Sequence, residues 1–246
     1  AIGIANVPAY GEYTVAEHTF ALILSLSRNV HKSWRHVVEG RIELAALTGF
    51  DLKDKTLGVI GAGKIGLHVI KIARGFGMRV LVFDVRQDSF LAELLGFAYV
   101  PLDQLLAESD IITLHVPYMA ATHHLINRER LARVKRCALL INTARGQLVD
   151  TDALIEALEN GTLAGAGLDV LEGEELITEE KALLHQAQSV DALRAIVRNN
   201  LLLKHDNVVF TPHNAFNSRE ALQRILDTTI ANIQAWRRGE SLNRVV

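Results

Sequence analysis

The feature that most restricts what this chain can fold into is a glycine motif between an apolar run and an amphipathic stretch. The motif is Gly61-Ala62-Gly63-Lys64-Ile65-Gly66. The apolar run before it, Thr56 to Ile60, predicts a buried strand, and the stretch Lys64 to Phe76 after it predicts a helix. In such a unit the first glycine permits a tight turn, the second lets a phosphate approach the backbone, and the third lets the helix lie close to the strand. We therefore predict a phosphate-binding loop at a helix N-terminus.

Short apolar runs alternate with amphipathic stretches along the middle of the chain. The predicted strands are Thr56 to Ile60, Arg79 to Phe83, Ala98 to Val100, Ile111 to Leu114, Ala138 to Ile141, Ala164 to Leu168 and Asn207 to Phe210. The predicted helices between them are Lys64 to Phe76, Ser89 to Leu95, Leu102 to Glu108, Arg128 to Val134 and Thr151 to Asn160. Strands that are apolar on both faces are typical of parallel sheets covered by helices. The pattern predicts an α/β fold, a doubly wound parallel sheet of the Rossmann type.

Two long helices are predicted to flank this block. The first begins at Thr14, because the Thr14 hydroxyl and the Glu17 carboxylate have the spacing of a capping box. The last runs from about Ser218 to Arg238, with apolar residues at helical spacing, and ends before Gly239. Each helix is long enough to form a dimer surface or to connect two domains.

Length and composition restrict the class of protein. The 246 residues are 49% apolar, which suffices for the core of one large domain or two smaller ones. The formal net charge of −2 gives no electrostatic reason to expect binding to nucleic acid or to an anionic membrane surface. The longest candidate membrane span, Phe20 to Leu26, falls short of the roughly 18 apolar residues that a span needs. We expect a soluble protein without a nucleic-acid or membrane partner.

The chain has one cysteine, Cys137, which cannot form a disulfide within the chain. A reducing cytoplasm is therefore the expected compartment. Cys137 itself is expected to be a buried small residue that leads into the strand beginning at Ala138.

An acidic residue stands where the second predicted strand ends. Asp84 lies 18 residues after Gly66, a position from which a carboxylate accepts hydrogen bonds from the ribose hydroxyls of a dinucleotide. A carboxylate there also repels a 2′-phosphate, so Asp84 favours NAD over NADP. Arg86 complicates this preference, because a nearby arginine can accommodate that phosphate, although a solvated loop charge is the favoured explanation of Arg86. We predict NAD as the cofactor.

Polar residues follow the predicted strands at the edge where the ligand of an open α/β sheet lies. They are His115-Val116-Pro117 after the fourth strand, Asn142-Thr143-Ala144-Arg145-Gly146 after the fifth, Asp169 after the sixth and Thr211-Pro212-His213 after the last. An arginine, an acid and a histidine at this edge could supply a carboxylate anchor, a group that orients the histidine, and a proton donor. Each alone could be a solvated turn residue, but their convergence favours a catalytic site.

The histidines do not predict a metal site. His123 and His124 are adjacent and are expected to point apart on either a strand or a helix, and neither they nor His115 has a well-spaced acidic or cysteine partner. A surface or interface role is expected for the histidines on or near the first helix, which are His18, His31 and His36. We assign no metal.

In combination, these motifs resemble those of the D-isomer-specific 2-hydroxyacid dehydrogenases. The resemblance rests on the glycine motif, Asp110 to Pro117, Ile141 to Gly146, Gly167-Leu168-Asp169-Val170 with Glu174, and Thr211-Pro212-His213. Three further segments are similar to the D-lactate dehydrogenase branch: Asn6 to Tyr10, Ala16-Glu17-His18 and Asn214-Ala215-Phe216. The similarity covers nearly the whole chain. It implies an NAD-dependent oxidoreductase that interconverts a 2-keto acid and a D-2-hydroxy acid.

The resemblance also implies roles for single residues. Arg145 would bind the substrate carboxylate and polarise the keto oxygen, and His213 would give or take the hydroxyl proton. Glu174 would hydrogen-bond His213, a choice over Glu172 that rests on family spacing, and Asp169 would help to hold the nicotinamide carboxamide. These residue types suit the chemistry, because hydride transfer places negative charge on the keto oxygen, which a cationic arginine and a protonated histidine stabilise.

The candidate site therefore has three overlapping sets of residues. The catalytic set is Arg145, Glu174 and His213. The cofactor-binding set is Gly61, Gly63, Lys64, Ile65, Gly66, Asp84, Val116, Pro117, Thr143, Ala144, Arg145, Asp169 and His213. The substrate set is Arg145, His213 and Tyr10, where Tyr10 is equally compatible with packing at a hinge.

Two features depart from the family pattern. The stretch between Glu174 and His213 is longer than in many relatives, and its amphipathic pieces near Glu179 to Gln186 and Val190 to Val197 are expected to cover the cleft or extend an interface.

The segment that builds most of the family's substrate domain is expected to be absent before Ala1, so this polypeptide alone is expected to bind NAD but turn over poorly. We assign residues 1–216 to an NAD-binding domain with hinge and long first helix, and residues 217–246 to a C-terminal helix belonging to the substrate domain.

The alternative function is that of an NAD-sensing regulator of the corepressor type, because such oligomeric corepressors resemble this family and keep its catalytic residues. The chain has no obvious partner-recruiting tail, which favours the enzyme; a pure dimerisation fragment is a third alternative. As an enzyme, its expected partners are a small 2-keto or 2-hydroxy acid and a second copy of the chain in a homodimer.

Overall fold

A seven-stranded parallel sheet forms the centre of the molecule. The computed structural model describes residues 3–174 and 190–245. Its strands are β1 Thr56–Ile60, β2 Arg79–Phe83, β3 Ala98–Tyr99, β4 Ile111–Leu114, β5 Ala138–Asn142, β6 Leu163–Leu168 and β7 Val208–Phe210. Neighbouring strands pair in parallel in the order β3-β2-β1-β4-β5-β6-β7. The predicted doubly wound α/β sheet is confirmed, and each strand lies within one residue of its predicted bounds.

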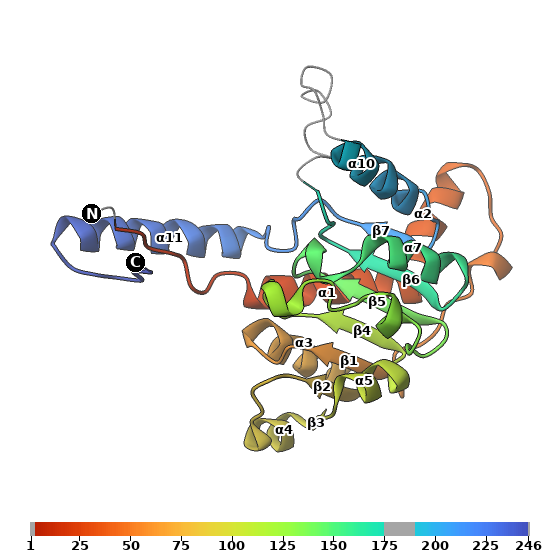
Figure 1. Cartoon of the computed structure of the whole chain (residues 1–246), viewed down its shortest axis with the longest axis horizontal. Helices are drawn as coiled ribbons and strands as arrows, with labels where there is room; N and C mark the ends of the chain where they lie inside the picture. Colours follow the sequence, from red (N-terminus) through yellow and green to blue (C-terminus); the bar gives the residue numbers. More distant parts are fainter. Residues whose placement is uncertain (1–2, 175–189, 246) are drawn as a thin grey trace.

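Helices cover both faces of this sheet (Figure 1). They are α1 Glu12–Ser27, α2 Val30–Val38, α3 Lys64–Gly75, α4 Ser89–Leu95, α5 Leu102–Glu108, α6 Arg128–Leu131, α7 Thr151–Glu159, α10 Val190–Leu203 and α11 Arg219–Arg237. Buried side chains of α1 and α3 pack on one face of the sheet, and those of α5, α6, α7 and α10 pack on the other. Burial on both faces explains why the strands are apolar throughout.

The strand order reverses between β1 and β4. From β1 the chain runs outward to β2 and β3, and then returns to β4 on the other side of β1. Ile60 at the end of β1 is in register with Leu114 at the end of β4, so the loops that begin at Gly61 and His115 leave the same edge of the sheet. Ligands of open α/β sheets bind at such a switch point, outside the carboxyl ends of the strands. The fold therefore places the glycine loop beside the strand-end residues.

Helix α11 and the two chain ends extend away from the sheet (Figure 1). Ser218 Oγ caps α11 by accepting from the backbone N–H of Ala221 at 3.1 Å, and Gly239 follows the helix with φ +75°, so both predicted ends are confirmed within one residue. Near the N-terminus, Ala5 forms an antiparallel bridge with Arg244. Apolar side chains of α11 that remain exposed are Leu222, Leu226, Ile230, Ile233 and Trp236.

The predicted start of the first helix is wrong. α1 begins at Glu12, and no side chain caps it. Thr14 lies inside the helix, where its Oγ1 is 3.1 Å from Ser218 Oγ. A contact between residues 204 positions apart has thus replaced the predicted local capping box, which no local pattern could have indicated.

Two predictions around β5 also need correction. Cys137 is exposed rather than buried, because its backbone turns with φ +64° just before the strand begins. The helix predicted from Arg128 to Val134 ends at Leu131 and continues as tighter turns, in which Arg133 N and Val134 N bond to carbonyls three residues earlier.

Helix α10 is the described part of the long segment before His213. It packs against α7 and β7, with Leu202 buried in the core on that side. The amphipathic piece predicted at Val190 to Val197 is therefore helical, whereas Glu179 to Gln186 lies outside the described residues. No helix in the described ranges is long and apolar enough to cross a membrane.

Candidate active site

A cavity of about 740 Å³ opens at the carboxyl ends of the central strands. It is lined by Tyr10, Val15, Ile65, His115, Val116, Pro117, Tyr118, Thr143, Ala144, Arg145, Gln147, Asp169, His213, Ala215 and Phe216. A second cavity of about 290 Å³ shares Tyr10, Val15, Ile65 and His115 with it and reaches Gly63 and Lys64. The structure thus brings most of the predicted site residues to one edge of the sheet, whereas none of the described residues of α10 lines either cavity.

The glycine loop presents its backbone to this space. Gly61 has φ +100°, and a Cβ there would lie 2.8 Å from the carbonyl oxygen of His115. A Cβ on Gly66 would lie 2.0 Å from the carbonyl oxygen of Gly61, so only glycine lets the helix lie this close. A Cβ on Gly63 would meet no atom within 4 Å, which leaves room for a ligand. The first backbone bond of α3 runs from Leu67 N to Gly63 O, so the amides of the first turn can bind an anion.

Asp84 supports the glycine loop from the side. Its Oδ2 accepts from Ala62 N at 2.7 Å and its Oδ1 accepts from Arg86 N at 2.8 Å. Each carboxylate oxygen has a further lone pair with which to accept a hydroxyl. The Arg86 side chain is exposed, and it is the Arg86 backbone that contacts Asp84. Lys64, at the start of α3, places its Nζ 3.6 Å from Glu12 Oε1. A negative charge at Asp84 suits a free ribose hydroxyl better than a 2′-phosphate.

Asn142 builds the turn that presents Arg145. The buried Asn142 amide donates to the Arg145 carbonyl at 2.8 Å and accepts from Ala144 N at 3.0 Å. Thr143 is tied to α1, since its Oγ1 lies 3.0 Å from Thr19 Oγ1. The exposed Arg145 guanidinium donates to the Ala144 carbonyl at 2.6 Å, and it has no acidic partner among the residues that the structure describes. The turn therefore presents an available cation to the cavity.

Asp169 is buried at the end of β6 and organises the loop that follows β7. Its Oδ1 accepts from Thr211 Oγ1 at 2.5 Å and from Asn214 N at 3.0 Å, and its Oδ2 accepts from Ala215 N at 2.9 Å. The Asp169 carbonyl accepts from His213 N at 2.8 Å. These bonds stabilise His213 at φ +51°, a left-handed conformation that histidine seldom adopts. The Asp169 carboxylate therefore holds the histidine loop in place.

A histidine–carboxylate pair lies at the mouth of the cavity. His213 Nδ1 is 2.7 Å from Glu174 Oε1, so the structure forms the predicted hydrogen bond. With the carboxylate at Nδ1, the ring hydrogen resides there and Nε2 is left for a ligand. The structure also separates the two candidate glutamates: Glu172 contacts His124 at 3.0 Å and Arg198 at 3.1 Å instead.

An aromatic ring and a neutral imidazole form walls of the cavity. Tyr10 lies edge-on to Phe216, with ring centroids 6.3 Å apart, and both residues line the cavity. Desolvation lowers the pKa of His115 to about 3, and His115 Nε2 lies 2.9 Å from Thr113 Oγ1. His115 is therefore neutral at physiological pH and is unsuited to be the proton donor.

His18 contacts the site, so of the surface or interface role predicted for it, the surface alternative is wrong. Its Nε2 lies 2.9 Å from Thr211 Oγ1 and 3.5 Å from Asp169 Oδ1. His18 thus supports the same buried carboxylate that holds the His213 loop. The sequence carried no signal for this contact, because His18 and Thr211 are 193 positions apart.

The adjacent histidines also differ from expectation. The rings of His123 and His124 are stacked, with centroids 3.9 Å apart, rather than pointing apart. His124 has φ +46°, which is neither strand nor helix, and the argument from regular structure therefore does not apply. Within residues 3–174 and 190–245, no group of three or more histidine, cysteine or acidic side chains is placed to hold a metal ion.

Comparison with known proteins agrees with this geometry. The family model described as "D-isomer specific 2-hydroxyacid dehydrogenase, NAD binding domain" matches residues 20–215. D-lactate dehydrogenase of Escherichia coli is 39% identical over 238 residues, which are 97% of this chain and 70% of that enzyme. Glyoxylate reductase of Korarchaeum cryptofilum is 40% identical over 244 residues, 97% of this chain and 67% of that enzyme.

A solved structure shares the fold closely. The crystal structure of D-lactate dehydrogenase from Aquifex aeolicus, complexed with NAD and lactic acid, has a TM-score of 0.89 and 40% sequence identity. The match covers 97% of this chain and 70% of that one. The predictions of an NAD cofactor and of an NAD-dependent oxidoreductase are confirmed by these matches. The chain belongs to the D-isomer specific 2-hydroxyacid dehydrogenase family, and residues 20–215 match the NAD-binding domain of that family.

Proposed function

We propose that this chain interconverts a short 2-keto acid and the corresponding D-2-hydroxy acid, as a D-lactate dehydrogenase does, with Arg145, Glu174 and His213 as its catalytic residues. One observation carries this proposal. An arginine without an acidic partner among the described residues and a histidine–carboxylate pair meet at one cavity, which adjoins the glycine loop. The relatives named for lactate and glyoxylate support a small substrate.

The residues at this edge fit NAD. The open space over Gly63 and the free amides of α3 suit a pyrophosphate, and Asp84 suits the ribose hydroxyls. When bound, NADH supplies the hydride that reduces the keto carbon. The residues proposed to hold the cofactor are Gly61, Gly63, Lys64, Ile65, Gly66, Asp84, Val116, Pro117, Thr143, Ala144, Arg145, Asp169 and His213.

Arg145 and His213 have different roles: Arg145 binds the substrate and His213 transfers the proton. The planar Arg145 guanidinium binds the substrate carboxylate through two parallel hydrogen bonds and polarises the keto oxygen. Protonated His213 gives its Nε2 proton to that oxygen as negative charge develops there, and takes the proton back when the hydroxy acid is oxidised. Glu174 keeps the ring hydrogen on Nδ1 and stabilises the imidazolium. Tyr10 forms the wall against the substrate side chain.

The test is NADH oxidation by the purified chain with pyruvate, glyoxylate and a bulkier 2-keto acid. We expect slow turnover of at least one of them by this chain, with the D-isomer of the hydroxy acid as product on chiral analysis. NADH binding is measured in parallel by fluorescence titration. Tight NADH binding without turnover of any keto acid would contradict the enzyme and favour the NAD-sensing regulator.

We further propose that the chain acts as a homodimer in the cytoplasm and that residues 217–246 belong with a substrate domain. The single cysteine supports a reducing compartment, and the position of α11 away from the sheet supports the domain assignment.

A dimer is supported by exposed apolar side chains on α2 and just after it: Val30, Trp34, Val37, Val38, Ile42 and Leu44. Sedimentation velocity of the wild type and of Trp34→Asp tests the dimer, since the substitution should shift the protein to monomer. Cell fractionation tests the compartment.

A further inference from the structure

We propose that Glu172 is a positioning residue for this reaction: held by Arg198 and His124, it anchors the loop that presents Glu174 to His213. This inference rests on the proposed function, because it assigns to Glu172 an effect on the proton-transfer pair. Glu172 itself does not line the cavity and has no place in the chemistry.

The loop from Leu171 to Glu174 is a tight turn closed by two hydrogen bonds between its first and last residues. Glu174 N donates to the Leu171 carbonyl at 3.2 Å, and Leu171 N donates to Glu174 Oε2 at 3.0 Å. The Glu174 carboxylate is thus shared between its own turn and His213. Its position depends on where this turn is held.

Three donors from two distant segments hold the turn at Glu172. His124 Nε2 lies 3.0 Å from Glu172 Oε1, and Arg198 Nη2 donates to Glu172 Oε2 at 3.1 Å. Asn199 Nδ2 donates to the Glu172 backbone carbonyl at 3.0 Å. Each carboxylate oxygen therefore has its own hydrogen-bond partner, and α10 forms hydrogen bonds with both the side chain and the backbone of Glu172.

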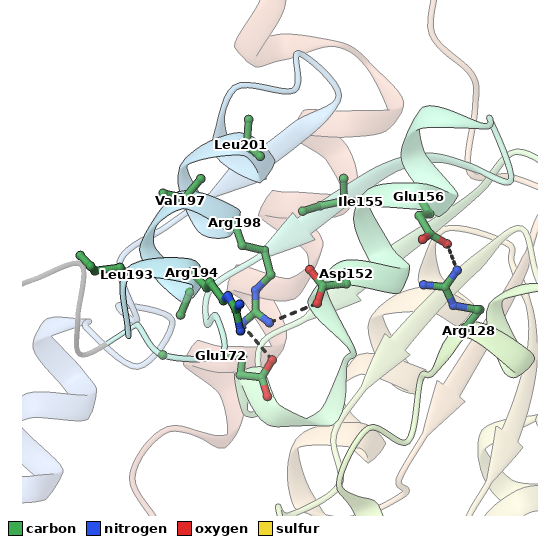
Figure 2. Close-up of a pocket in the computed structure, with 12 residues that line it drawn as sticks. Arg128, Asp152, Ile155, Glu156, Glu172, Leu193, Arg194, Val197, Arg198 and Leu201 are labelled. Carbon is green, nitrogen blue, oxygen red and sulfur yellow. Dashed lines mark hydrogen bonds and ion pairs between the residues drawn. The ribbon is translucent and has the colours of Figure 1, made fainter. Parts of the chain in front are cut away.

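Partial burial strengthens this anchor. The side chains of Glu172 and Arg198 are each 21% exposed and that of His124 is 31% exposed. Arg198 lies in a groove of about 1140 Å³ between α7 and α10, where it reaches Glu172 on one side and Asp152 on the other (Figure 2). The Asp152 contact is weaker, at 3.7 Å, and the Asp152 side chain is 68% exposed. Charged hydrogen bonds out of bulk water stabilise a conformation more than surface pairs do.

The same turn also contacts the backbone at Gly146, next to the proposed substrate-binding residue Arg145. A Cβ on Gly146 would lie 2.1 Å from the Leu171 carbonyl carbon and 2.3 Å from Glu172 N, so the two backbones are in direct contact. Gly146 follows Arg145 directly. Displacing the turn at Glu172 therefore disturbs the histidine pair and the arginine together, whereas the glycine loop at Gly61 to Gly66 makes none of these contacts.

Glu172→Gln tests the inference with the smallest change of shape. The glutamine amide nitrogen is a donor: facing Arg198 it would meet another donor, and facing His124 it would require the imidazole hydrogen to move to Nδ1. In either orientation the charge that pairs with Arg198 is lost. We expect kcat for keto-acid reduction to fall about tenfold, the cost of one charged hydrogen bond, while the Kd for NADH stays within about twofold of the wild type. The decline of kcat at high pH should also begin at lower pH, because a displaced Glu174 no longer stabilises protonated His213.

Asp152→Asn is the matched control, because it removes the other carboxylate that contacts Arg198 and leaves Glu172 untouched. Glu174, which contacts His213, and Asp169 and Arg145, which line the same cavity, are the same in both variants. We expect Asp152→Asn to keep the wild-type kcat and pH profile. Arg198→Met should reproduce the effect of Glu172→Gln, provided that circular dichroism shows both variants folded. A Glu172→Gln variant with the kcat and pH profile of Asp152→Asn would overturn the inference.

A second readout separates this inference from the proposed function. The imidazole signal of His213 is followed by NMR through a pH titration, with His213→Ala identifying the signal. Glu172→Gln should shift its titration midpoint to lower pH and Asp152→Asn should not. If the wild type turns over no 2-keto acid, the proposed function fails, but the His213 titration still decides whether Glu172 anchors the pair. An unchanged titration in Glu172→Gln would overturn the inference alone.

Discussion

The two halves of the cavity are built in different ways. The cofactor half, where the phosphates and the ribose of NAD are proposed to lie, comes from one short stretch of chain, residues 61–86, in which glycine backbone, free helix amides and a single carboxylate form the binding surface. The residues proposed to hold the nicotinamide belong to the reaction half. The reaction half is assembled from side chains in the loops that follow β5, β6 and β7, and it is held by side-chain hydrogen bonds to α1 and α10. Binding of NAD and proton transfer should therefore be separable by mutation.

The largest separation is expected for His213→Ala. Without the imidazole the proposed proton donor is lost, so kcat should fall about 10³-fold. The Kd for NADH should rise no more than about threefold, because the glycine loop is untouched. Steady-state kinetics and NADH fluorescence titration measure the two effects, with His205→Ala as the control outside the cavity. A loss of NADH affinity as large as the loss of kcat would break the comparison.

Glu174→Gln tests the same half with a smaller change. The amide can still contact Nδ1, but it no longer stabilises the imidazolium by opposite charge. We expect a fall in kcat of about 30-fold at neutral pH. Keto-acid reduction needs the protonated ring, so its rate falls as pH rises, and the pH profile of kcat should differ between the variant and the wild type. An unchanged pH profile would remove Glu174 from the proposed role.

Asp84→Asn addresses the cofactor half. Asparagine keeps one acceptor for Ala62 N or Arg86 N but loses the charge. The Kd for NADH should rise about tenfold, while kcat at saturating NADH stays unchanged. Binding of NADPH should weaken less or improve, because the carboxylate no longer repels the 2′-phosphate. A fall in kcat at saturating NADH would show that the two halves are coupled.

Asp110→Asn is a control for the comparison of the two halves. Asp110 lies just before β4, at the amino ends of the strands and away from the cavity. Partial burial raises the pKa of Asp110, but the Lys135 ammonium and the Thr56 N–H outweigh it and hold this pKa below the ordinary value. A carboxyl group with a lowered pKa in the folded state stabilises the protein at neutral pH, and this contribution disappears as the pH falls through that pKa. Urea unfolding should show a loss of about 1 kcal/mol at pH 7 that shrinks below about pH 4. The kcat and the Kd for NADH should both stay at wild-type values.

The accuracy of sequence-based prediction differs between the halves for a physical reason. The conformations of Gly61 and Gly66 are required by backbone packing against residues close in the chain or in the adjoining strand, so a short motif carries them. The predicted strand ends placed Arg145 and His213 where a ligand lies, but their individual roles and the choice of Glu174 came only from the combined motifs of a family. The roles of His18 and Glu172 were not predicted, because their contacts join residues 193 and 26 positions apart and leave no local periodicity.

The sequence by itself determined the parallel sheet, the bounds of its strands, the glycine loop and the preference for NAD. These follow from apolar periodicity and from local backbone geometry, which neighbouring residues control. Only the tertiary structure decided which glutamate reaches His213, that Thr14 contacts Ser218 instead of capping α1, and that Asp169 is engaged by Thr211 and the loop amides. Hydrogen bonds between distant side chains depend on how elements pack in three dimensions, and no spacing along the chain specifies that packing.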